Sequence, residues 1–211
     1  MKLVLPPAGT LKPNNEHDPL PYYYRPLLGW LYRQRLQMGL DLLPHGGERV
    51  LEVGVGSGIL VPTLTARFPV YTGADLVLAD GLPPLVAPGC QARFVRADLL
   101  APADLPAASF DTVVCLSVLE HVADVESAAA ALARALVPGG TLVAGYPMVN
   151  RLMAGFFRAI GFADIEAHHV TAPVAIDRAL RRILRPVARR SIPPLAPIPI
   201  ALYQCTSWRK D

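Results

Sequence analysis

The sequence predicts an α/β fold in which helices connect the strands of a mostly parallel sheet. Short apolar and β-branched runs alternate along the 211 residues with stretches that have helical periodicity. Such alternation is typical of parallel strands joined by right-handed crossovers. A second observation is the stretch VLEVGVGSGIL at residues 50–60, where an apolar run turns through glycines into a predicted helix. No internal repeat or second domain is indicated, and a chain of this length can bury one full core.

The predicted elements follow one another in a regular order. Residues 1–21 are rich in proline and should be irregular. Leucines recur at helical spacing from residue 22 to about residue 43, and Pro-His-Gly-Gly then ends this helix. Glycines and prolines crowd residues 81–89, so the connection there should be short or irregular. Further helices are predicted at residues 59–68, 125–136 and 150–160, and strands at residues 49–53, 70–75, 93–97, 110–117, 141–146, 165–170 and 198–207.

Composition and charge argue against several classes of protein. The net charge is only +3, which gives no case for a wholesale nucleic-acid binder. Cys90, Cys115 and Cys205 are widely spaced and form no CxxC pair, so they predict no metal site and indicate reduced thiols in a cytoplasmic protein. No run of about 18 apolar residues is present, so no membrane-spanning helix is expected.

The glycines of the first turn indicate a ligand that approaches the backbone closely. A strand that passes through Gly54, Gly56 and Gly58 into a helix leaves space for the ligand and points the helix N-terminus at it. A tight turn without any ligand is the simpler alternative. A dinucleotide would require the pattern G-x-G-x-x-G, and Ile59 stands here at the sixth position. The pattern therefore disfavours a pyrophosphate.

The sequence Glu52-x-Gly54-x-Gly56-x-Gly58 resembles motif I of the class I S-adenosylmethionine-dependent methyltransferases, of the type that acts on small molecules. The resemblance spans about residues 45–147. Further landmarks of that family follow in order, namely Asp75 at the end of the second strand, Ala97-Asp98-Leu99 following the third, Leu116 to Val122 at the end of the fourth, and Leu136 to Leu142 at the turn into the fifth.

This resemblance implies a fold and a division of the chain. The fold would be a Rossmann-like sheet of seven strands, mostly parallel with the last strand antiparallel, with helices on both faces and an N-terminal helical cap. Residues 1–211 would form a single domain. Within it, residues 1–44 would cap the site, residues 45–147 would bind the cofactor, and residues 148–211 would lie on the substrate side. The implied cofactor is S-adenosyl-L-methionine.

The resemblance also implies roles for individual residues. Asp75 would bind the ribose hydroxyls, because a carboxylate accepts two hydrogen bonds at once and charge-assisted bonds are strong. Asp98 would meet the adenine amino group, and Glu52 the methionyl amino group, although Glu52 could instead organise the glycine turn. The full set of expected cofactor-binding residues is Glu52, Gly54, Val55, Gly56, Gly58, Asp75, Leu76, Asp98, Leu99, Leu116 and Ser117.

His121, at the mouth of the fourth strand, is the candidate general base, and His168 or His169 is the second candidate. The alternative for His121 is a structural role, in which it caps the next helix or bonds to Glu120. The turn after the fourth strand lacks the Asn/Asp-Pro-Pro-aromatic and Pro-Cys sequences of enzymes that methylate DNA bases in this fold. A small, apolar or lipid-like acceptor is therefore favoured over nucleic acid, with methylation on oxygen or nitrogen rather than carbon.

Residues 174–190 are predicted to form a basic amphipathic helix, because their arginines recur on one side. Such a helix could make peripheral contact with an anionic membrane surface. The alternative is an ordinary cap helix with a solvated arginine face. Two other functions stay open for the whole chain: an NAD(P)-binding oxidoreductase, and a non-catalytic cofactor-binding partner of the same fold. Nothing in the sequence indicates the oligomeric state.

Overall fold

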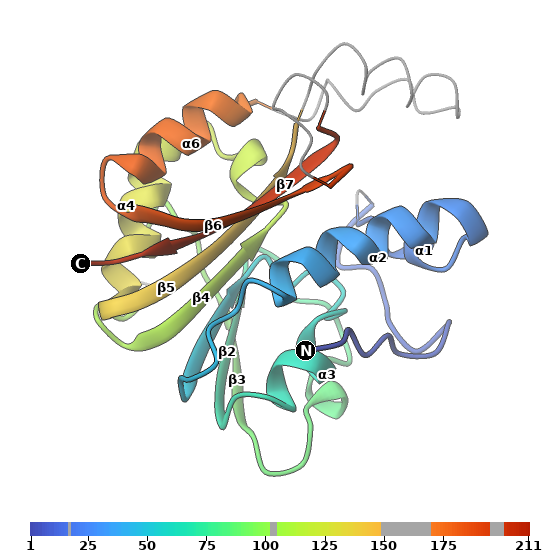
Figure 1. The fold of residues 1–211 in the computed structure, drawn as a ribbon. Coiled ribbons are helices and arrows are strands. Elements are labelled where there is room, and N and C mark those ends of the chain that lie inside the picture. Colours follow the sequence, from blue (N-terminus) through green and yellow to red (C-terminus); the bar gives the residue numbers. More distant parts are fainter. Residues whose placement is uncertain (17, 102–104, 149–169, 195–200) are drawn as a thin grey trace.

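A seven-stranded sheet forms the centre of the molecule (Figure 1). The computed structural model describes residues 1–16, 18–101, 105–148, 170–194 and 201–211. The strand order is β3-β2-β1-β4-β5-β7-β6, in which β7 runs antiparallel to both of its neighbours. The predicted sheet is therefore confirmed. The strands are β1 (Arg49–Val53), β2 (Val70–Asp75), β3 (Gln91–Arg96), β4 (Phe110–Leu116), β5 (Leu136–Pro147), β6 (Arg185–Ile192) and β7 (Tyr203–Arg209).

Helices cover both faces of this sheet, as predicted (Figure 1). On one face, α4 and α6 bury alanines and leucines against β1, β4 and β5. On the other face, α1, α2 and α3 pack against β1, β2 and β4. Side chains of a strand point alternately to opposite faces, so each central strand contributes to both cores. The helices are α1 (Leu20–Tyr23), α2 (Pro26–Leu40), α3 (Val61–Thr65), α4 (Val125–Ala135) and α6 (Pro173–Arg181), with single 3-10 turns η1 (Pro83–Leu85) and η3 (Leu119–His121).

Proline explains why two predicted helices are shorter than expected. The N-terminal helix is split into α1 and α2, because Arg25 precedes Pro26 and has an extended backbone (ψ 144°). The second helix, predicted for residues 59–68, is observed only as α3. Its first turn holds Pro62, and the chain leaves it ahead of Pro69, which disfavours helical backbone in the preceding residue.

The predicted basic helix at residues 174–190 is wrong in its second half. Helix α6 ends at Arg181, and the chain continues as strand β6 from Arg185. Pro186 has no backbone N–H for a helix interior, and it favours an extended Arg185 before it. The sixth strand was predicted at residues 165–170, and of that range only Val170 belongs to the described residues. The predicted helix at 150–160 lies outside them. The last strand, predicted at residues 198–207, is observed at Tyr203–Arg209, and residues 198–200 also lie outside the described ranges.

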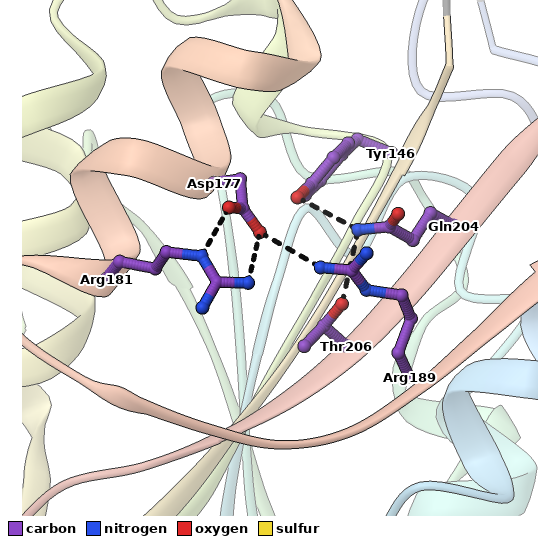
Figure 2. A network of polar contacts seen from close by, with 6 residues as sticks. All are labelled: Tyr146, Asp177, Arg181, Arg189, Gln204 and Thr206. Atoms are coloured by element: carbon purple, nitrogen blue, oxygen red, sulfur yellow. Dashed lines mark hydrogen bonds and ion pairs between the residues drawn. The ribbon is translucent and has the colours of Figure 1, made fainter. Parts of the chain in front are cut away.

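Several arginines of this segment are held in ion pairs instead of forming one free basic face. The carboxylate of Asp177 on α6 accepts from Arg181 Nε at 2.5 Å and lies 3.5 Å from a guanidinium nitrogen of Arg189 on β6 (Figure 2). Beside this pair, the Gln204 amide contacts the Tyr146 hydroxyl at 3.4 Å and the Thr206 hydroxyl at 3.3 Å. The network fastens α6 to β6.

Candidate functional site

A cavity of about 460 Å³ lies at the carboxyl ends of the first four strands. Its floor is formed by the end of β1 with the glycine turn, and its walls by the residues that follow β2, β3 and β4. The strand order reverses here, because β1 pairs with β2 on one side and with β4 on the other. In open α/β sheets such a switch point is where ligands bind.

The cavity wall brings together every predicted cofactor-binding residue except Gly58, and it also includes His121. A Cβ atom at Gly58 would lie 2.6 Å from Leu82 and 2.8 Å from Leu85. Gly58 therefore permits the glycine turn to pack against η1. In the described structure its role is close packing, and the sequence spacing alone could not separate this role from ligand contact.

The other two glycines shape the cavity in different ways. Gly54 and Gly56 have φ values of +81° and +54°, which L-residues with side chains rarely adopt. A Cβ atom at Gly54 would lie 2.2 Å from Val118, so this glycine lets the segment after β4 approach the turn. At Gly56 the nearest atom to such a Cβ would be an Asp18 oxygen at 3.6 Å. Gly56 thus exposes bare backbone to the cavity.

The carboxylate of Asp75 is fixed in orientation by the backbone around it. Its Oδ2 accepts from the Gly56 N–H at 2.8 Å, and its Oδ1 accepts from the Val77 N–H at 3.2 Å. After β3, Asp98 Oδ1 accepts from the Leu100 N–H at 2.9 Å. Both acids therefore stand in defined positions at the cavity, and each carboxylate retains lone pairs for further donors.

Glu52 is a buried carboxyl group at the end of β1. The Tyr71 hydroxyl donates to its Oε2 at 2.5 Å. Burial raises the pKa of Glu52 to about 8, because the ionised form loses its hydration, and the hydrogen bond from Tyr71 opposes this rise. A cation that enters the cavity beside Glu52 would favour its ionised form.

Arg35 is a cavity residue that the sequence analysis did not single out. It comes from α2, and one of its terminal nitrogens donates to the Ser117 hydroxyl at 2.7 Å. Its guanidinium carbon lies 4.5 Å from the ring centroid of Tyr32 and 4.6 Å from that of Tyr203. Its Nε is buried and has no hydrogen-bond partner among the described residues. The sequence held no signal that separates Arg35 from the neighbouring arginines 25 and 33.

The N-terminal segment supplies a second group of cavity residues that were missed. Asn14, Asn15, Asp18 and Pro19 line the cavity, and Asp18 lies beside the glycine turn. The Asn14 side chain donates to the Val77 carbonyl at 3.0 Å, which joins this segment to the loop after β2. Burial raises the pKa of Asp18, while hydrogen bonds from Asn14, Leu20 and Ser57 act in the opposite direction. The irregular residues before α1 therefore cover the site.

His121 lies on η3, directly after β4, and its side chain is 48% exposed. Its Nε2 is 3.9 Å from Oε1 of Glu120, which is beyond hydrogen-bond distance. Glu120 is buried, its Oε2 has no hydrogen-bond partner among the described residues, and burial raises its pKa to about 7. The second candidate bases, His168 and His169, lie outside the described residues.

Neither a metal-binding cluster nor a membrane-spanning helix is found in the described part of the chain. Across residues 1–16, 18–101, 105–148, 170–194 and 201–211, no group of three or more His, Cys, Asp or Glu side chains is arranged to hold a metal ion. In the same ranges no helix has both the length and the apolar character that a membrane span requires.

The curated proteins to which the chain is similar include methyltransferases whose names concern quinones. The chain is 36% identical over 162 residues to a "Ubiquinone biosynthesis O-methyltransferase" of Paracidovorax citrulli, a match that covers 74% of this chain and 60% of that protein. It is 35% identical over 119 residues to a "Demethylmenaquinone methyltransferase" of Thermus thermophilus, covering 53% of this chain and 51% of that protein. The chain thus spans less than two thirds of the length of these relatives.

Comparison with solved structures shows the same fold at low sequence identity. The N-methyltransferase NodS of Bradyrhizobium japonicum, crystallised with S-adenosyl-L-homocysteine, superposes with a TM-score of 0.62 at 19% identity, covering 92% of this chain and 93% of that one. The [4+2]-cyclase SpnF superposes with a TM-score of 0.61 at 15% identity, covering 94% and 86%.

The family assignment comes from a match to a family model over most of the chain. Residues 30–186 match the model described as "Methyltransferase domain". This range contains most of α2 with Arg35, the glycine turn, Asp75, Asp98 and His121. By its sequence, its sheet and the position of its cavity, this chain belongs to the methyltransferase domain family.

Proposed function

We propose that the protein transfers the methyl group of S-adenosyl-L-methionine to a small apolar acceptor. The observation that carries this proposal is one cavity lined by the glycine turn, by the oriented carboxylates of Asp75 and Asp98, and by Arg35, whose buried Nε has no hydrogen-bond partner in the described part of the chain. An adenosine linked to an amino acid presents hydroxyls, an amine, an ammonium and a carboxylate, and this set of groups fits those partners.

The cavity residues divide between the two ends of the proposed cofactor. At the nucleoside end, Asp75 would accept from the ribose hydroxyls, and Asp98 with the Leu99 N–H would hold the adenine. At the amino-acid end, Glu52 would face the ammonium and Arg35 the carboxylate, because opposite charges favour that orientation. Gly56 would let the ligand lie against the backbone.

When bound, this cofactor supplies an electrophilic methyl group on a sulfonium, so the protein mainly has to position the acceptor and exclude water. Leu116, Val118 and Val122 give the cavity an apolar wall beside His121. We propose that this wall receives an acceptor methylated on oxygen or nitrogen, and that His121 takes the proton which the acceptor releases. The names of the curated relatives, which concern quinones, support an apolar acceptor of this kind.

A substitution of His121 tests its proposed role as base. His121→Ala should lower kcat by about 100-fold, the usual contribution of a positioned base, while affinity for S-adenosyl-L-homocysteine stays the same. Activity is corrected for the folded fraction, measured by circular dichroism. A variant that loses stability but keeps its turnover per folded molecule would assign His121 a structural role instead.

Ligand-dependent stabilisation separates the proposal from its rivals. S-adenosyl-L-homocysteine at about 100 times its Kd should add about 2.7 kcal/mol to the free energy of unfolding, and NADH at the same concentration should add nothing. Stabilisation by NADH alone would favour the oxidoreductase. Because a cyclase shares the fold, binding does not by itself establish methyl transfer. Release of S-adenosyl-L-homocysteine from S-adenosyl-L-methionine in the presence of a quinol acceptor would exclude a non-catalytic partner.

We also propose that the cap contacts a membrane surface, although not through residues 174–190. Arg181, Arg182 and Arg189 of that segment are ion-paired with acids of the protein itself. Helix α2 instead exposes Leu27 and Trp30, by 89% and 57% respectively, one turn apart beside the exposed Arg25. Tryptophan with flanking arginine is typical of the water–lipid boundary, which is also where an apolar acceptor would gather.

A further inference from the structure

We propose that Tyr203 on β7, acting through Ser117, is the positioning residue that holds Arg35 for the carboxylate of the cofactor. The last strand of the sheet would then select nucleosides that carry an amino-acid tail over nucleosides that lack one. This inference rests on the proposed function, because it needs S-adenosyl-L-methionine as the ligand. It assigns a role to a strand that contributes no lining residue of its own to the cavity.

The contacts form a short chain from β7 to the cavity. The Tyr203 hydroxyl lies 2.8 Å from the Ser117 hydroxyl, which in turn accepts from Arg35 at 2.7 Å. The Tyr203 ring centroid is 4.6 Å from the guanidinium carbon, within the range of a cation–π contact. Tyr203 itself is only 2% exposed, so its ring is fixed by the core and can hold the guanidinium in place.

The backbone of Ser117 has a strained conformation, which places its hydroxyl between Tyr203 and Arg35. Its φ is +58°, in the left-handed region that few residues other than glycine adopt. Its N–H donates to the Gly145 carbonyl at 2.7 Å, which fixes the conformation from the neighbouring strand. Strained backbone of this kind is typical of functional sites, where it directs a side chain or a backbone group toward a ligand.

Glycine at position 145 makes room for the tyrosine hydroxyl. A Cβ atom at Gly145 would lie 2.9 Å from the Tyr203 hydroxyl oxygen and 2.8 Å from the Cys205 sulfur. Contacts below 3.0 Å essentially never occur for real Cβ atoms, so any side chain here would displace β7 side chains. The small residue on β5 therefore lets Tyr203 reach Ser117.

Holding the Arg35 side chain in place before the ligand binds reduces the entropy that is lost on binding. A long, flexible side chain loses rotamer entropy when it orders around a ligand, and a guanidinium that is already ordered loses less per bond formed. Its buried Nε has no hydrogen-bond partner among the described residues, and a carboxylate can accept two parallel bonds from a guanidinium. Holding Arg35 in place should therefore raise affinity only for ligands that bring a carboxylate.

Two ligands that differ in that group provide the test. S-adenosyl-L-homocysteine carries the amino-acid tail, whereas 5′-methylthioadenosine has the same nucleoside and a thioether without it. Tyr203→Phe keeps the ring and removes the hydroxyl. It should weaken the affinity for S-adenosyl-L-homocysteine by about three- to tenfold, as expected for one hydrogen bond, and leave the affinity for 5′-methylthioadenosine unchanged. Isothermal titration calorimetry on the full chain measures both affinities.

Three further variants keep the test decisive. Ser117→Gly removes the linking hydroxyl but suits the positive φ, so it should give the same selective loss even if Tyr203→Phe folds poorly. Arg35→Gln should remove most of the preference for S-adenosyl-L-homocysteine. Tyr146→Phe is the matched control, because it deletes a buried hydroxyl that contacts Gln204 in the network next to α6 and should leave both affinities unchanged.

The outcomes separate this inference from the proposed function. Equal weakening of both ligands by Tyr203→Phe would show a merely structural role and overturn the inference. Unchanged binding of both would overturn it as well. If Arg35→Gln lost the preference while Tyr203→Phe and Ser117→Gly kept it, the cofactor site would stand without the positioning role. If the wild-type protein bound neither ligand, the proposed function itself would be wrong.

Discussion

Asp75 is the residue on which the nucleoside end of the proposed site depends most directly. Its two oxygens are already oriented by backbone N–H groups of Gly56 and Val77. Asp75→Ala should weaken the binding of S-adenosyl-L-homocysteine by about 1.5–3 kcal/mol, the usual contribution of a hydrogen bond to a charged group. Calorimetry measures the change. Unaltered affinity, with the fold intact by circular dichroism, would place the ribose elsewhere.

Glu52 should make stability depend on pH. Burial raises its pKa to about 8 from the usual 4.5, so the native state keeps a proton that the unfolded chain has released. The free energy of unfolding should therefore fall as pH rises through this window, by at most about 1.4 kcal/mol per pH unit, and level off above pH 8. Glu52→Gln should flatten the curve in urea unfolding between pH 5 and 8. Glu120, whose pKa burial also raises, should leave a smaller slope in the variant, and an identical slope would refute the assignment.

Asp75 and Asp98 could be predicted because the resemblance to the methyltransferase family assigns roles to acids at these two positions. Asp75 and Asp98 stand at strand ends, and parallel strands bring their ends to one edge of the sheet. Arg35 and Asp18 could not be predicted in this way. They come from segments that reach the cavity only through tertiary packing of the N-terminal region over the sheet, and no local pattern records that packing.

At the scale of an element, two glycines of the glycine turn should have different roles, Gly56 in ligand contact and Gly58 in packing. Gly56→Ala and Gly58→Ala both place a side chain at positive φ, with a strain of about 1–2 kcal/mol. At Gly56 the new methyl group faces the cavity, so affinity for S-adenosyl-L-homocysteine should fall more than tenfold. At Gly58 it meets Leu82 and Leu85, so the larger loss should be in stability. Urea unfolding and calorimetry on both variants measure the two effects, and equal profiles would contradict the distinction.

Elements were predictable where the chain repeats a simple pattern and less so where two patterns overlap. The four strands from β1 to β4 were predicted close to their observed bounds, because apolar runs bounded by turn residues identify buried strands, whereas β5 begins at Leu136, ahead of its predicted start at residue 141. Residues 185–192 follow a helical spacing of arginines, yet they form β6. There the hydrogen-bonded pairing of β6 with β7 and the proline at 186 favour a strand. The helical spacing of exposed arginines contributes little energy in favour of a helix.

At the scale of the whole molecule, the cap should bring the protein to anionic lipid. Wild-type protein should co-sediment at low salt with vesicles that contain phosphatidylserine, less so at high salt, and not with neutral vesicles. Leu27→Ser with Trp30→Ser should abolish this binding, because both side chains are exposed on α2. Val174→Ser with Val187→Ser is the matched control on the segment first predicted to bind. Loss of binding in the control pair alone would return the contact to that segment.

The contact between Arg35 and Tyr203 also sets an order of events during synthesis. The ribosome releases α2 before any strand, whereas β7 is made after every other strand of the sheet and then enters between β5 and β6. Contacts between residues so far apart in sequence form slowly. A nascent chain can therefore form the proposed contact that holds Arg35 for the amino-acid end of the ligand only after β7 has inserted. Retention of S-adenosyl-L-homocysteine would then mark chains that have finished folding.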